Sequence, residues 1–71
     1  DGSIRALVNA QKVIMIDRVR YLGGKYLERG EILLEEKETL HEMYDAYKEL
    51  GGNGHLETAM HEVDRLPVAG K

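Results

Sequence analysis

The chain has 71 residues, a formal net charge of −3, and no cysteine, tryptophan or phenylalanine. This length limits it to one small domain, and the lack of cysteine excludes a disulfide framework and a thiolate metal site. A core of aliphatic residues and four tyrosines is small for a chain that folds alone, so we expect support from self-association. We interpret residues 1–71 as a single helical domain excised from a longer protein, with flexible ends at residues 1–3 and 68–71.

The first 29 residues predict one long helix. Ser3 is a good N-cap for a helix over residues 4–29. The apolar residues of this segment recur at helical spacing, which predicts an apolar stripe. They are Ile4, Leu7, Val8, Met15, Val19, Leu22 and Tyr26. Gly23 and Gly24 cost about 2 kcal/mol of helix propensity relative to alanine, but we expect the helix to continue through them.

The centre of this helix is apolar all round. Val13, Ile14 and Ile16 widen the stripe there, and such a patch indicates either deep burial or contact with a helix of another chain. A chain of this size is too small to cover the patch from all sides. We therefore predict a homodimer or higher oligomer with these three residues at its interface.

Two shorter helices are predicted after the first. Arg29 and Gly30 are typical of a helix end, since a cation and then glycine suit that position. The second helix is expected over residues 34–50 and the third from residue 54 or 55 to residue 66, capped by Asn53 and stopped by Pro67. The residues expected to face inward are Leu40, Met43, Tyr44, Tyr47 and Leu50 in the second helix, and Leu56, Met60 and Val63 in the third. The fold class predicted is all-α, a compact three-helix domain.

The run Gly51-Gly52-Asn53-Gly54 joins the last two helices. Its residues tolerate positive φ, so we predict a structural corner there, as at Gly30. A phosphate-binding loop is the weaker interpretation. The run follows a helix rather than a strand, and it lacks the Gly-Lys-Ser/Thr ending of a nucleotide loop.

No catalytic or metal-binding pattern is recognisable. His41-Glu42 and His61-Glu62 begin like a zinc-protease helix, but Asp45 and Arg65 stand where the second histidine belongs. No Ser/His/Asp spacing is present and there is no cysteine nucleophile. We therefore expect no enzyme activity, no cofactor and no metal.

The charge divides along the chain. Residues 1–29 hold six basic and three acidic side chains, whereas residues 30–71 hold four basic and ten acidic ones. A basic cluster with interleaved tyrosines is a candidate phosphate-binding face. It consists of Arg18, Arg20, Tyr21, Lys25 and Arg29. Charges on a small helical protein mostly solvate exposed faces, which is the simpler interpretation of this cluster. Because the whole chain is acidic, any DNA binding is expected to be weak. Because it would use backbone phosphates, it is expected not to be sequence-specific.

Several short motifs resemble small phage and prophage proteins of Gram-positive hosts. They are Arg5-Ala6-Leu7-Val8, Asp17-Arg18, the run from Tyr26 to Gly30, the run from Met43 to Tyr47, the run from Leu50 to Gly54, and Leu66-Pro67. Among such proteins, the chain is similar to the C-terminal domain of the membrane-anchored DNA-replication organiser of protein-primed Bacillus phages. It departs from that pattern in being acidic and in having no tryptophan.

The resemblance implies a function and a location. It implies a dimeric helical domain that binds and organises DNA in the bacterial host cytoplasm, tethered to the membrane through a segment outside this fragment. The fragment itself is expected to make no membrane contact. The alternative is a structural or assembly protein of a virion, tail or lysis module that binds no nucleic acid. The dimeric architecture carries over more readily than DNA binding, because of the two departures.

Overall fold

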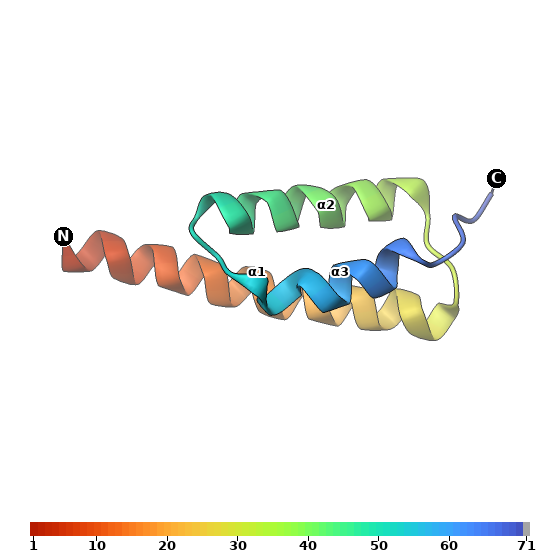
Figure 1. Cartoon of the computed structure of the whole chain (residues 1–71), viewed down its shortest axis with the longest axis horizontal. Helices are drawn as coiled ribbons and strands as arrows, with labels where there is room; N and C mark the ends of the chain where they lie inside the picture. Colours follow the sequence, from red (N-terminus) through yellow and green to blue (C-terminus); the bar gives the residue numbers. More distant parts are fainter. Residues whose placement is uncertain (71) are drawn as a thin grey trace.

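The computed structural model describes residues 1–70 and is all-helical, as predicted (Figure 1). It contains α1 (Gly2–Arg29), α2 (Leu34–Glu49), the single 3-10 turn η1 (Gly54–Leu56) and α3 (Glu57–Asp64). The chain runs out along α1, back along α2 and out again along α3 (Figure 1). Both later helices pack against α1 and against each other. Within residues 1–70 the β structure is limited to one isolated parallel bridge between Ile32 and Val68.

The start of α1 differs from the prediction. Asp1, not Ser3, is the N-cap, and its Oδ1 accepts hydrogen bonds from the backbone N–H groups of Ser3 (2.8 Å) and Ile4 (3.1 Å). Serine and aspartate are similarly good N-caps, so the sequence alone does not decide between them. The aspartate carboxylate satisfies two free N–H groups and places a negative charge at the positive end of the helix dipole. The Ser3 prediction is therefore wrong, and residues 2 and 3 belong to the helix.

The helix continues through Gly23 and Gly24, as predicted. The two glycines have different surroundings. Gly23 is buried, and a Cβ there would lie 3.2 Å from Cγ2 of Val63, so glycine lets α3 approach α1 closely. A Cβ on Gly24 would have no neighbour within 4 Å. Gly23 is thus required for close packing of α3 on α1. Gly24 has no such role and destabilises the helix by about 1 kcal/mol relative to alanine.

The core lies between the second half of α1 and the two shorter helices. The fully buried side chains come from all three helices and from the segments that join them: Val19, Ile32, Leu40, Tyr47, Leu56, Met60 and Val63. Partly buried residues pack around them, among them Met15, Ile16, Leu22, Tyr26, Met43 and Tyr44. The inward faces predicted for the second and third helices are therefore confirmed, except for Leu50, which is the half-buried C-cap of α2 and lies outside this cluster.

The C-terminal segment closes the domain. Ile32 donates its N–H to the carbonyl of Pro67 (3.0 Å), and Ala69 donates its N–H to the carbonyl of Ile32 (2.8 Å). These bonds hold Val68 beside the fully buried Ile32. The sequence predicted a flexible end at residues 68–71, of which Lys71 lies outside the described residues. The helix α3 ends at Asp64, before the expected Leu66. The chain then approaches the connection between α1 and α2.

The glycine corner has the geometry of a helix end. Gly51 has φ +87°, and its N–H donates to the carbonyl of Lys48 (3.0 Å), while the N–H of Gly52 donates to the carbonyl of Tyr47 (3.0 Å). This pair of bonds with a left-handed glycine is the Schellman motif, which satisfies the free carbonyls at the end of α2. Asn53 makes no side-chain capping bond, contrary to the prediction. Its Oδ1 instead accepts the hydroxyl of Tyr47 at 3.4 Å.

We predict that Gly52→Ala destabilises the protein. A Cβ on Gly52 would overlap the ring of the buried Tyr47, and such overpacking costs about 1–3 kcal/mol. Gly24→Ala is the matched control, since it adds the same methyl group in open space inside a helix and should stabilise by about 1 kcal/mol. Urea unfolding of both variants measures the difference. Equal stability of Gly52→Ala and the parent would show that the corner does not constrain the fold.

Candidate interaction surfaces of α1

The N-terminal half of α1, residues 2–14, lies outside the core and is called the projecting half. Figure 1 shows its first turns, coloured red, extending past the ends of α2 and α3, while its last residues reach the glycine corner. Packing of α1 against the core begins at Met15. The radius of gyration is 13.3 Å over extents of 47 × 17 × 15 Å, whereas a compact chain of this length has about 11 Å. The first half of the longest helix therefore lies outside the core of its own chain.

The projecting half exposes large apolar side chains. Ile4, Leu7, Val13 and Ile14 have exposed fractions of 62%, 67%, 65% and 59%. The chain has a solvent-accessible surface of 4939 Å², which exceeds the roughly 4,450 Å² expected for a compact monomer of this size. The projecting half of α1 is thus an apolar surface that intrachain packing leaves open to water.

The three residues predicted at an oligomer interface have different environments. Ile16 is half-buried and packs against the core, whereas Val13 and Ile14 are exposed. Successive residues of an α-helix are about 100° apart, so Val13 and Ile14 present separate faces to solvent. The structure therefore leaves Val13 and Ile14 available to another chain and gives Ile16 a role within the domain.

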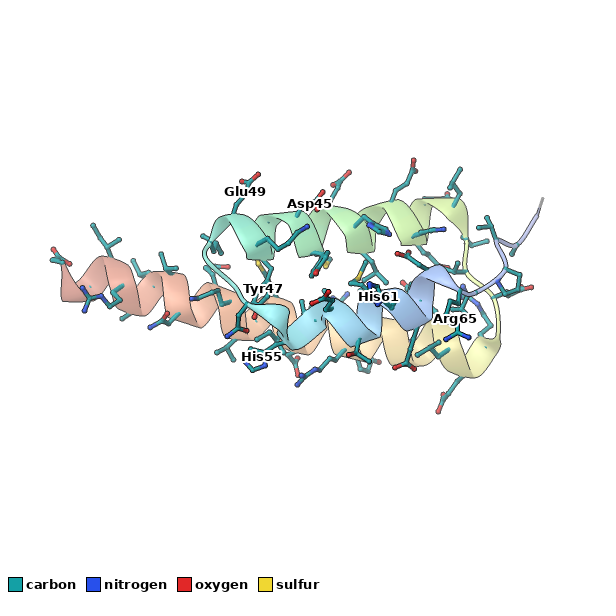
Figure 2. The ribbon with its side chains drawn as sticks, viewed as in Figure 1. Asp45, Tyr47, Glu49, His55, His61 and Arg65 are labelled. Carbon is teal, nitrogen blue, oxygen red and sulfur yellow. The ribbon has the colours of Figure 1, made fainter. Side chains whose placement is uncertain are left out.

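A shallow groove lies where α1 passes the glycine corner. It has a volume of about 240 Å³, and its lining includes Val13 and Ile16 of α1, Tyr47 of α2, and Gly52 and His55 of the corner and η1. In Figure 2 the Tyr47 side chain points from α2 into the space between the helices. Val13 therefore lies at the edge of a groove, whereas Ile14 lies outside that groove on another face of α1.

The basic residues of α1 do not form one free cluster. Arg18, Tyr21 and Lys25 are exposed and follow one another at three- and four-residue steps, so they share one flank of the helix. Lys25 Nζ lies 5.3 Å from the centre of the Tyr21 ring. Arg20, about 200° around the helix from Arg18, donates from Nη2 to the carbonyl of His55 at 3.3 Å.

Arg29 is committed to the connection between α1 and α2. Its guanidinium bonds both carboxylate oxygens of Glu36 and donates from Nε to the carbonyl of Glu31 (3.1 Å). It also lies over the ring of Tyr26, with Cζ 5.0 Å from the ring centre. Glu36 in turn accepts the N–H of Leu33 at 2.9 Å, which caps the start of α2. Arg29 was one of the five residues predicted to bind nucleic acid, but its guanidinium instead joins α1 to the start of α2.

The Arg29–Glu36 contact shifts both ionisations. The hydrogen bond from Arg29 lowers the pKa of Glu36 below its usual range, and the N–H of Leu33 lowers it further. The same hydrogen bond raises the pKa of Arg29. Arg29 is exposed and Glu36 is half-buried, so screening by solvent limits the contribution of the pair to stability.

The glycine corner and His41 have structural partners. The amides of Gly51 and Gly52 are bonded to carbonyls of α2, so they are not free to hold a phosphate. His41 Nε2 lies 2.7 Å from Oδ1 of Asp64, which joins α2 to α3. Within residues 1–70 no three histidine, aspartate or glutamate side chains form a group that could hold a metal ion.

Comparison with protein-family models, curated proteins and solved structures gives no match for this chain. Across residues 1–70, the helices are all too short or too polar to cross a membrane. The surfaces of α1 therefore have to be interpreted from their own geometry.

The sequence pattern did not predict that Ile4 and Leu7 are exposed. Both were assigned to the same stripe as Met15 and Val19, which pack in the core. A signal was present, since Leu7 and Val8 are about 100° apart on a helix and belong to different faces. The lengths of the later helices were the missing information, because they decide how much of α1 is covered.

We predict that the Arg29–Glu36 contact makes stability depend on pH in the acid range. Because folding lowers the pKa of Glu36, its stabilising contribution is full above the pKa of an unfolded glutamate, about 4.3, and is lost as the pH falls below that value. Glu36→Gln should therefore lower the melting temperature at neutral pH, and this difference from the parent should shrink progressively as the pH falls below about 4.3.

Glu38→Gln serves as the control. Glu38 is an exposed glutamate of the same helix, with no ion pair in the part of the chain that the structure describes. Its substitution should change the melting temperature little at neutral pH. A pH-independent difference between Glu36→Gln and the parent would show that the contact does not stabilise the fold.

Proposed function

We propose that the protein is an assembly protein that self-associates through the projecting half of α1. The observation that supports this proposal most directly is the exposure of Ile4, Leu7 and Ile14 on one flank of the helix half that lies outside the core. Large apolar side chains exposed together in this way are typical of a protein–protein contact. The burial of such surface would also support a core of only seven fully buried side chains.

Nucleic-acid binding is the second candidate. One specific observation favours it: the exposed flank of Arg18, Tyr21 and Lys25, where two cations bracket an aromatic ring. Three observations weigh against it. Arg29 is paired with Glu36, Arg20 is bonded on another side of α1, and the chain carries a net charge of −3. The two cations of this flank, on an acidic protein, give little phosphate affinity.

The biological setting of the assembly rests on the resemblance to small phage proteins. A component of a virion, tail or lysis module needs a surface for self-association and no catalytic site. A replication organiser needs a dimer and, in addition, a cationic surface. The projecting apolar half of α1 suits both settings, whereas the basic flank suits the second alone.

We predict that the protein is a dimer or larger at high micromolar concentration and that Leu7→Asp weakens its association. A buried, unpaired charge costs more than about 1.4 kcal/mol, so the dissociation constant should rise by roughly tenfold or more. Leu34→Asp is the matched control, because Leu34 is an exposed leucine on α2 and an aspartate in a first helical turn is favourable. Light scattering over a concentration series measures both variants. A parent protein that is monomeric throughout the series would refute the proposed function.

We predict no shift of duplex or single-stranded DNA by the parent protein, even at low salt. Gel-shift titration tests this, with a double variant Arg18→Ala/Lys25→Ala and a control Lys37→Ala/Lys48→Ala that removes the same charge from the acidic half. A shift that the first double variant abolishes and the control retains would establish nucleic-acid binding at the basic flank. Such binding should then weaken steeply with added salt.

A further inference from the structure

The exposed apolar residues of α1 follow a regular spacing on one flank. Ile4, Leu7, Ile14 and Tyr21 are separated by three and then seven residues, and they are exposed by 62%, 67%, 59% and 56%. A step of seven residues falls about 20° short of two full helical turns, so these side chains form a stripe that winds slowly around the helix, as in a heptad repeat. The residues that face the core, such as Met15 and Val19, follow a separate stripe. The helix therefore carries two apolar stripes, and its own chain covers one of them.

The outer stripe matches the pattern of a coiled coil. Its positions 4, 7, 11, 14, 18 and 21 alternate by three and four residues, which is the a/d spacing of a heptad repeat. Gln11 and Arg18 fill the positions between the apolar residues. From this spacing we infer that the outer stripe is the seam of a parallel, in-register coiled coil with a second copy of this chain. The inference rests on the proposed self-association and specifies its surface and orientation.

The parallel orientation follows from the residues that would face each other. In a parallel pair each seam position meets its own equivalent, so Ile4, Leu7, Ile14 and Tyr21 make apolar layers. Gln11 then faces Gln11 of the second copy, where the two amides can bond each other. A polar residue at an a position can specify register in this way. An antiparallel pair joins a to d positions and would set Gln11 against Leu7, Ile14 or Tyr21, leaving its amide without a partner.

The continuity of α1 favours association along this stripe. The part of α1 before Met15 would be marginal as an isolated helix, but it belongs to one helix of 28 residues. Its helical start is capped by Asp1, and its end continues into the packed half. The helix is thus already nucleated, so a second copy gains apolar contact without first ordering the backbone. This reduces the entropy that association removes.

The seam also contains an unfavourable layer. Arg18 would face Arg18 of the second copy, and like charges repel. Salt screens such repulsion, so self-association through this seam should strengthen as the salt concentration rises. Binding of nucleic acid to Arg18 would show the opposite dependence.

Cysteine crosslinking tests the seam. The chain contains no cysteine, so each introduced thiol reports on one position. Leu7→Cys and Ile14→Cys should both form disulfide-linked dimers of the full chain under mild oxidation. Val13→Cys is the matched control, because Val13 is as exposed as its neighbour Ile14 but lies about 100° away around α1. We expect both seam variants to crosslink at least about tenfold faster than the control, since pairing raises the effective concentration of the thiols.

The outcomes separate the seam from the proposed function. Faster crosslinking at Val13 would place the interface on the groove side, and crosslinking at one seam position alone would indicate an antiparallel pair; either result overturns the inference and leaves self-association standing. Light scattering of the reduced variants measures association independently. Monomers in that measurement, with no crosslinking preference, would overturn both. Circular dichroism confirms that each variant is folded, as expected at exposed positions.

Discussion

The length of α1 is the constraint on which the structure depends. Its 28 residues span about 42 Å, whereas the 16 residues of α2 span about 24 Å and the 8 residues of α3 about 12 Å. Two short helices cannot cover one long helix, so the chain builds a core on the second half of α1 and leaves the first half exposed. The small core, the elongated shape and the apolar surface all follow from this mismatch.

The charged residues divide between solvent and the connections. The acidic side chains of α2 other than Glu36 are exposed, and Figure 2 shows Glu49 pointing away from the other helices. Two basic residues of α1 serve the connections instead: Arg29 secures the start of α2 through Glu36, and Arg20 donates to the carbonyl of His55. Part of the basic cluster therefore maintains the fold. This is why the basic cluster is weaker as a nucleic-acid surface than its composition indicates.

Most of the fold could be predicted from local patterns. Helical spacing identified Leu40, Tyr47, Leu56, Met60 and Val63 as core, and the glycines marked both helix ends. The pairing of Val68 with Ile32 could not be predicted, because it joins distant segments and has no periodic signal. The interaction surface was predicted in part. Val13 and Ile14 are exposed as an interface requires, but Ile16 packs in the core and the role of Ile4 and Leu7 depends on how far α2 and α3 reach.

The central claim is that the projecting half of α1 obtains its packing from a second chain. Amide hydrogen exchange, measured residue by residue at low and high protein concentration, tests it most directly. The account predicts that residues 5–14 become more protected as concentration rises, while the core half of α1 around Val19 keeps constant protection. Equal protection of both halves at every concentration, or an unprotected first half even in concentrated solution, would contradict it.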